Sequence, residues 1–487
     1  MTTPVSLSMP SPGGLFDRDR IRLYCGILLA AEIAVFLFMV AGTHGLIVPL
    51  PKPTSTDFVS FYAAGSLANA GTPELAYDKA EHYAAEQRAT QVGIDYNFFY
   101  YPPTFLLLCA AITHLPYIVA FLIFEMATLC FYLLVARRIL DDRAAAILVP
   151  LLAFPPVLWT FGLGQNAFLT AGLFGSATLL VDRRPAVAGA LFGALCYKPH
   201  FALLVPVALA AGGRWRALVA TFASAAGLCL LSSTIFGWEV WRDFLTAAVA
   251  SPAVYQSGRI SFSGFINPFG AVLLLGGNST MAYGAQAATI LAAALVVAYV
   301  WYQDLPLPIR AATLASATLA ALPVALFYDL MLAAIAAAWL LRADGKYRLA
   351  EWEKVVLACL FFLTLDPRSL SEISHLPIGP LVTLGFAAFV VTHVVRVNAI
   401  VAARPKWSFC TRSRSLPVHP RTSNKSPTTR SREPYDYLRA PTPITNSYRL
   451  FNRIEPDYPE TNPVVGKPMG DQQNGCGRSV NRFETEP

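Results

Sequence analysis

Two aspartates stand at the start of candidate helices and have the chemistry of a general base. Asp57 comes after Thr54-Ser55-Thr56 and opens an amphipathic segment, and Asp329 follows Tyr328 at the start of an apolar one. Each can simply cap a helix, since aspartate is favoured at that position. A carboxylate partly removed from water can instead take a proton from a hydroxyl group. The residues alone leave open which aspartate would be the base.

Two cations have the chemistry to hold a phosphate group. Lys198 lies between two short apolar segments, and Arg259 lies in the polar loop 255–267. A lysine at membrane depth is costly unless it is paired or solvated. Lys198 is therefore either an anchor that reaches the membrane surface or a point charge that meets a phosphate. Arg259 is either a charge on the rim of a site or an anion clamp.

Uncharged polar side chains mark breaks between apolar runs. Gln165 and Asn166 follow Gly164, and Tyr101 precedes two prolines. The break at Gly164 is either a plain turn or a set of hydrogen-bonding groups for a sugar. A further loop holds charged residues, most of which we expect to be solvated: Asp366, Arg368, Glu372 and His375.

Several common catalytic signatures are missing from the sequence. There is no Walker loop, no GxGxxG, no HExxH and no serine nucleophile elbow. The eight cysteines show no Cys/His ligand spacing, so no structural zinc site is predicted. Because nothing indicates a soluble nucleotide site, a sugar donor used outside the cell would have to arrive already activated on a lipid.

The composition excludes an ordinary soluble enzyme. The 487 residues are 55% hydrophobic and only 14% charged, whereas soluble chains carry about 25% charged residues. The apolar residues gather in blocks close to the roughly 20 residues that a bilayer-spanning helix needs. The sequence therefore predicts an all-α polytopic membrane protein.

The apolar blocks predict about twelve transmembrane helices. Their ranges are 23–40, 117–137, 143–160, 166–181, 185–197, 199–212, 216–236, 280–302, 309–322, 328–342, 354–366 and 379–397. The short pair 185–197 and 199–212 is expected to dip in and return, as broken segments that line a cavity do. Within the polar stretch 43–116, apolar residues at helical spacing predict short amphipathic helices on the outer membrane face.

Charge asymmetry orients the predicted helices. The loops on one side of the predicted helices hold most of the arginines and lysines. By the positive-inside rule, that side is the cytoplasm. Residues 1–22 are then cytoplasmic, residues 23–403 form the membrane domain, and the loop with Asp57 faces the periplasm or exterior. Residues 404–487 contain 12 prolines and no apolar run of helical length. We predict a disordered cytoplasmic tail there, and no nucleic-acid partner.

Taken in order, several short motifs resemble glycosyltransferase family 87. They are Asp57-Phe58-Val59-Ser60-Phe61-Tyr62-Ala63-Ala64-Gly65, Gly71-Thr72-Pro73-Glu74-Leu75-Ala76-Tyr77-Asp78, Tyr101-Pro102-Pro103, Gly164-Gln165-Asn166, the block 189–199 ending in Lys198-Pro199, and Tyr328-Asp329. The set covers roughly residues 20–400. The tail has no counterpart in the family.

The resemblance implies a GT-C type fold and an inverting transfer of a hexose, mannose above all, from a polyprenyl-phosphate donor to a glycolipid or glycan. It implies a bacterial plasma membrane enzyme whose site faces outward and whose catalytic base is Asp57. Lys198 or Arg259 would hold the donor phosphate. The sugar or acceptor would meet Tyr101, Gln165, Asn166, Tyr328 and Asp329. The motifs require no metal, although a divalent cation remains open.

Two other interpretations stay open at this point. The first is a different GT-C transferase for a pentose, an amino sugar or a whole glycan, in which Asp57 and Lys198 keep similar roles. The second is a lipid or sugar transporter, which the helix count and broken segments suit. The long outer loop and the lack of two similar halves argue against a transporter.

Overall fold

The computed structural model describes residues 18–41, 48–49, 53–54, 56–142, 144–256, 261–343 and 347–402. All structural statements below concern these residues. Arg259 and the predicted tail 404–487 lie outside them.

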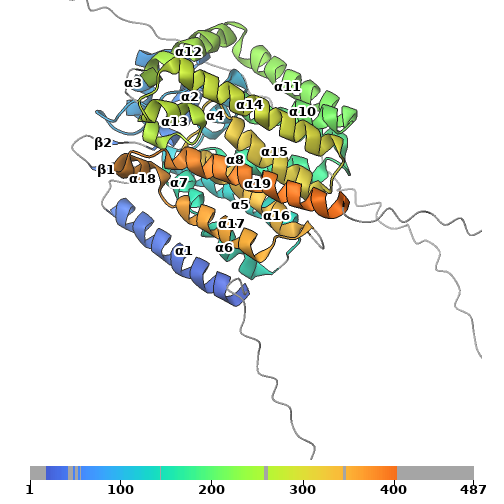
Figure 1. Cartoon of the computed structure of the whole chain (residues 1–487). Coiled ribbons are helices and arrows are strands. Elements are labelled where there is room, and N and C mark those ends of the chain that lie inside the picture. Colours follow the sequence, from blue (N-terminus) through green and yellow to red (C-terminus); the bar gives the residue numbers. More distant parts are fainter. Residues whose placement is uncertain are drawn as a thin grey trace, which may run out of the picture. The chain divides into compact units, whose positions relative to one another are not determined.

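Within the described residues, five helices are long and apolar enough to cross a membrane. They are α1 (Arg18–Ala41), α5 (Tyr117–Leu140), α11 (Trp215–Phe236), α14 (Ser279–Tyr302) and α19 (Ile378–Ala402). Most apolar side chains of α1, α11 and α14 are not covered by protein, as expected of surfaces that face lipid. In Figure 1, α1, α14 and α19 run in roughly one direction. The all-α membrane class agrees with the prediction, but the count of twelve spanning helices is not confirmed.

Several of the predicted helices are shorter than expected because prolines and glycines interrupt them. The expected helix 143–160 is divided into α6 (Leu148–Leu152) and α7 (Pro156–Leu163), since proline disfavours helical geometry in the residue before it. The other short helices in the described region are α8 (Ala167–Leu180), α9 (Pro185–Ala194), α10 (Val205–Ala211), α13 (Pro268–Leu274), α15 (Leu307–Ala321), α16 (Met331–Arg342) and α17 (Glu351–Leu363). The core lies around α15, where every residue from Ile309 to Ala321 is buried.

The segment that the sequence predicts as the first outer loop folds into its own helical layer. A short pair of strands, β1 (Val48–Pro49) and β2 (Pro53–Thr54), precedes α2 (Phe58–Asn69), η1 (Pro73–Tyr77), α3 (Lys79–Ala89) and α4 (Pro103–Ile112). A Cβ on Gly65 would lie 2.2 Å from the backbone oxygen of Cys109, so α2 and α4 are in close contact. Since eight of the twelve α2 residues are buried, α2 is packed inside protein rather than lying as an amphipathic helix on the membrane face.

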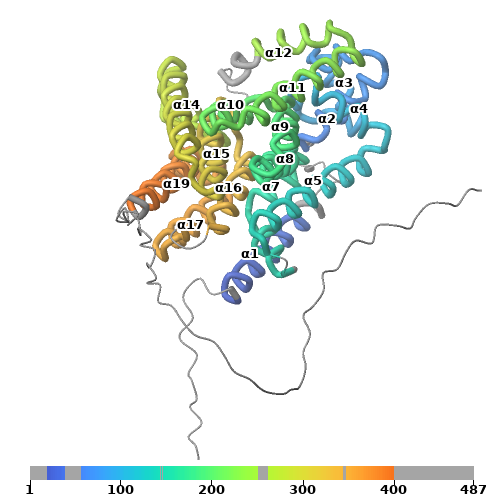
Figure 2. The backbone as a smooth tube through the Cα atoms, turned by 90° about the vertical axis from the view of Figure 1, so that its right-hand side faces the viewer, coloured from blue at the N-terminus to red at the C-terminus, as the bar shows by residue number. Residues whose placement is uncertain are grey.

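Besides α13, two helices in other parts of the described chain lie where the sequence predicted loops. The 18-residue α12 (Glu239–Gln256) packs on η1 and α4, with the rings of Phe244 and Tyr77 5.8 Å apart. Figure 2 shows α12 gathered with α2, α3 and α4. The eight-residue α18 (Pro367–Ser374) packs on η5 (Phe262–Gly264) and α19. Both contain polar residues that a search for apolar blocks passes over.

Candidate active site

Asp57 occupies the N-cap position of α2, but its side chain does not cap the helix. Its Oδ2 instead accepts a hydrogen bond of 2.7 Å from Nε2 of Gln165, 108 residues later in the chain. The neighbouring Thr56 and Phe58 are buried, while Asp57 remains partly exposed. The carboxylate is therefore held by a tertiary contact rather than by the start of its own helix.

The surroundings of Asp57 raise its pKa above the usual value for aspartate. Burial is the main cause, because it penalises the charged form. The hydrogen bond from Gln165 and the positive charges of Arg368 and Lys198 act in the opposite direction. A carboxylate with a raised pKa is a stronger proton acceptor once ionised.

Gln165 connects Asp57 to Tyr101. Its Oε1 accepts a hydrogen bond of 3.4 Å from the Tyr101 hydroxyl, which leaves Nε2 facing Asp57. The preceding residue, Gly164, ends α7 in the left-handed conformation with φ of 70°. A Cβ there would lie 2.5 Å from that of Phe58. Only glycine can make this turn at this distance from α2, and the turn presents Gln165 to Asp57.

Lys198 is buried and paired, and so does not act as a snorkelling anchor. Its Nζ lies 3.0 Å from Oδ1 of Asp329, and the two residues are 4% and 5% exposed. The other oxygen of Asp329 accepts from the Leu326 backbone N–H at 3.1 Å, at the start of η6 (Phe327–Leu330). Asp329 therefore closes the first turn of η6 with one oxygen and balances the charge of Lys198 with the other.

Aromatic rings surround the Lys198 ammonium group. Its Nζ lies 5.9 Å from the Tyr101 ring centroid, 5.3 Å from that of Phe201 and 5.5 Å from that of Tyr328. These distances allow cation–π attraction. Tyr101 thus contacts both halves of the site, the lysine pair through its ring and Asp57 through Gln165.

The structure gathers every predicted site residue that it describes into one group. Contacts run from Asp57 through Gln165 and Tyr101 to Lys198 and Asp329. Tyr328 packs on the lysine, and the Asn166 side chain lies beside the Tyr101 hydroxyl. Arg259 is the exception, because it falls outside the described residues.

Arg368 also belongs to this group, although the sequence places it in a solvated loop. It sits at the start of α18, and its charge lowers the pKa of Asp57. Its Nε lies 3.1 Å from Oε1 of Glu372, which in turn accepts a 2.9 Å hydrogen bond from the Ser263 hydroxyl. The signal that could have revealed it is Asp366-Pro367, a helix start, where Asp366 caps α18 by accepting from the Ser369 N–H.

Two buried titratable residues of α3, His82 and Glu86, lie close to α2 and to the segment that follows α3. Nε2 of His82 lies 3.1 Å from the Ser60 backbone oxygen, and the Glu86 carboxylate accepts from the Asn97 N–H. Burial lowers the pKa of His82 to about 4. Burial also raises the pKa of Glu86 to about 8, opposed by the Asn97 hydrogen bond and assisted by the Asp57 charge. Both groups are thus held in their neutral forms near neutral pH.

No cluster of three or more His, Cys, Asp or Glu side chains that could hold a metal ion is found in the described parts of the chain.

The comparisons with known proteins agree with the sequence motifs. The family model for glycosyltransferase family 87 matches residues 99–326. That range includes Tyr101, Gln165, Asn166 and Lys198, whereas Asp57 lies before it and Asp329 after it. No curated protein and no solved structure matches the chain.

Proposed function

Because residues 99–326 place this chain in glycosyltransferase family 87, we propose that it moves a hexose, mannose above all, from a polyprenyl phosphate to a glycolipid or glycan. The family and the apolar helices make the chain a membrane glycosyltransferase. The proposal adds the donor, the acceptor class and a bacterial plasma membrane with the site facing outward. The observation that carries it is the Asp57 carboxylate, oriented by Gln165 and flanked by Lys198 and Arg368.

In the proposed reaction, an acceptor hydroxyl oxygen attacks the anomeric carbon of the donor sugar. The bond from that carbon to the phosphate oxygen breaks, and its electron pair leaves with the polyprenyl phosphate. The hydroxyl proton passes to Asp57, whose raised pKa suits a general base. A single displacement inverts the configuration at the anomeric carbon.

Arg368 changes the proposed assignment of the phosphate site. The charge of Lys198 is already balanced by Asp329 at 3.0 Å, so the pair adds little net charge. Arg368 lies on the Asp57 side of the site and is about half exposed. Its ion pair with Glu372 is exposed and therefore weak. We propose that Arg368 meets the departing phosphate and that Lys198 and Asp329 orient the sugar or acceptor.

The test is a transfer assay with purified protein in nanodiscs, radiolabelled polyprenyl-phosphate mannose and a bacterial lipid extract. Asp57→Asn should retain donor binding and lose label transfer by about 100- to 10,000-fold, the range for general acid–base catalysis. The matched control is Asp95→Asn, an exposed aspartate of the same loop, which should transfer normally. Normal transfer by Asp57→Asn would show that the base lies elsewhere, and Asp329→Asn would then be tested.

The same preparation separates the transferase from a transporter. If the protein were a transporter, it would move the donor across a bilayer without reacting it. Neither the wild type nor Asp57→Asn would then form a labelled glycolipid. Label in a new glycolipid from the wild type excludes that alternative, and replacing mannose by other sugars on the same lipid identifies the sugar.

A further inference from the structure

A second polar centre lies where α9 and α11 begin. A cavity of about 520 Å³ is lined there by Val181, Asp182, Pro185, Gly213, Arg214, Trp215 and Arg216. This volume falls in the range of small-molecule sites in proteins. Trp215 is also the first residue of the apolar helix α11, so the cavity opens at a membrane boundary.

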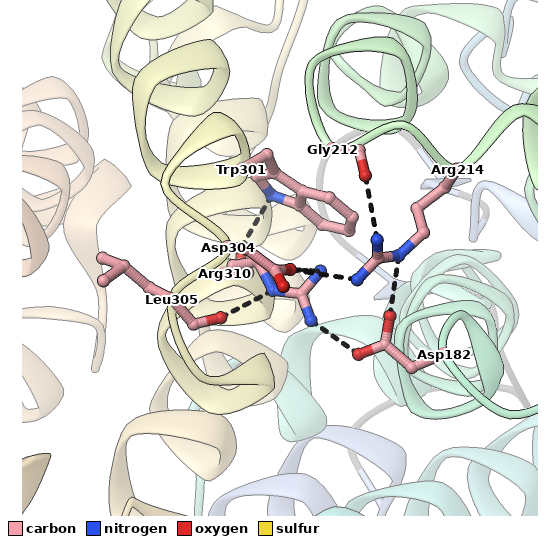
Figure 3. A network of polar contacts seen from close by, with 7 residues as sticks. All are labelled: Asp182, Gly212, Arg214, Trp301, Asp304, Leu305 and Arg310. Carbon is pink, nitrogen blue, oxygen red and sulfur yellow. Dashed lines mark hydrogen bonds and ion pairs between the residues drawn. The ribbon is translucent and has the colours of Figure 1, made fainter. Parts of the chain in front are cut away.

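The back wall of the cavity is a charge network that is balanced within itself. Arg214 pairs with Asp182 at 2.9 Å and with Asp304 at 3.0 Å, and Arg310 pairs with Asp182 at 2.5 Å (Figure 3). Trp301 Nε1 donates to the Arg310 backbone oxygen. Two arginines meet two aspartates, so this network joins α11 and α15 to the ends of α8 and α14 and contributes no net charge.

The rim of the cavity carries charge that no described residue balances. Arg216 lines the cavity, and Arg183 and Arg184 stand between the lining residues Asp182 and Pro185. All three are exposed, and none forms an ion pair with any residue in the described ranges. Arg216 therefore contributes to the lining one positive charge that no described residue pairs, and Arg183 and Arg184 add two more in the turn beside it.

The helix packing adds to this positive field. A Cβ on Gly189 would lie 2.2 Å from the Ala217 backbone oxygen, and one on Gly193 would lie 2.4 Å from that of Thr221. These pairs advance in the same direction, so α9 and α11 run parallel and in close contact. Both N-termini, Pro185 and Trp215, line the cavity, and helix N-termini attract anions.

We propose that this cavity binds the phosphate headgroup of an anionic membrane lipid. A lipid rather than a soluble anion fits because the cavity adjoins the apolar surface of α11, where Trp215 is 61% exposed and Val219 is 67% exposed. Tryptophan at this level is typical of the bilayer interface. Basic pockets between membrane helices recognise lipid phosphates in this way. The site is separate from Asp57, and the inference does not depend on the proposed transfer reaction.

The test uses native mass spectrometry of the full chain, titrated with phosphatidylglycerol or phosphatidylcholine of the same acyl chains. The wild type should retain phosphatidylglycerol in preference to phosphatidylcholine. The triple variant Arg183→Gln, Arg184→Gln, Arg216→Gln should weaken that binding on the order of 100-fold, about fivefold for each arginine. Arg214 is left intact because it holds the network.

The matched control removes the same charge from exposed arginines at other helix ends, as Arg20→Gln, Arg138→Gln, Arg348→Gln. It should bind phosphatidylglycerol as the wild type does. An equal loss in both triple variants would show general attraction and overturn the site. Complete displacement of the lipid by inorganic phosphate would also overturn the lipid assignment, because the ligand would then be a soluble anion. Equal melting temperatures confirm that all three proteins are folded.

Discussion

At the scale of single residues, the candidate site depends on hydrogen bonds that fix a carboxylate without neutralising it. Gln165 donates to Asp57 and accepts from Tyr101. An amide in this position orients the carboxylate and leaves its second oxygen available to an acceptor. Lys198 and Asp329 differ, since each satisfies the other. This contrast supports Asp57 rather than Asp329 as the proposed base.

Gln165→Ala should lower the transfer rate by about 10- to 100-fold, the worth of a hydrogen bond to a charged group. It should also move the rising limb of the pH–rate profile to higher pH, because the Gln165 hydrogen bond lowers the pKa of Asp57. The measurement is kcat against pH. Gln87→Ala, which removes an exposed amide of α3, is the control. An unshifted profile in Gln165→Ala would contradict the orienting role.

The buried Glu86 should make the outer loop less stable at alkaline pH. Its pKa is about 8 in the folded protein and near 4.5 in an unfolded chain. The stability that the protonated form contributes is therefore complete below about pH 4.5 and is lost as the pH rises through 8. The loss is at most about 1.4 kcal/mol for each pH unit.

Thermal unfolding in detergent between pH 5 and pH 9 would check this expectation, with Glu86→Gln as the comparison. The variant should lose less stability than the wild type over that interval, because glutamine cannot ionise. If the melting temperatures of the two proteins changed equally with pH, the Glu86 carboxyl would not titrate in this window.

At the scale of elements, α9 is placed by its glycines. Gly193 lies so close to α11 that a Cβ would meet the Thr221 backbone oxygen at 2.4 Å. Since Lys198 comes four residues after α9 ends, the packing of α9 on α11 also sets the position of the lysine. A glycine in the middle of a helix otherwise costs up to about 1 kcal/mol relative to alanine.

Gly193→Ala should therefore destabilise the protein by about 1–3 kcal/mol, as overpacking does, and should lower transfer activity. Gly227→Ala on α11 is the matched control, because a Cβ there would meet nothing within 4 Å. That variant should be as stable as the wild type or slightly more stable. Melting temperatures in detergent distinguish the two. If Gly193→Ala left the melting temperature unchanged, α9 and α11 would be able to move apart freely.

At the scale of the whole molecule, the sequence predicted the class of fold better than its details. Hydropathy located α5, α11 and α14 to within a few residues, because apolar blocks of about 20 residues are typical of helices that span a bilayer. The count of twelve spanning helices is not confirmed, since Pro155 divides the expected helix 143–160 and five described helices are long and apolar enough to span. It missed α12 and α18, because their exposed polar residues interrupt the apolar pattern on which the search relied.

Motif order pointed to residues that the structure brings together, but it did not predict which of them pair. Motif order indicated Asp57, Gln165 and Lys198. No spacing rule joins residues 57 and 165, or 198 and 329, because those contacts come from helix packing over long separations. Arg368 was hidden for the same reason, since its charge matters only once α18 is folded beside the first outer loop.

The position of Asp57 also affects how relatives of this protein should be recognised. The region that carries the family signature begins at residue 99, whereas the proposed base lies upstream in α2. The Asp57 side chain is joined to that region by the hydrogen bond from Gln165. A homologous chain could thus keep the whole signature and still have lost the proposed base. Sorting active members from inactive descendants requires reading the segment before the signature.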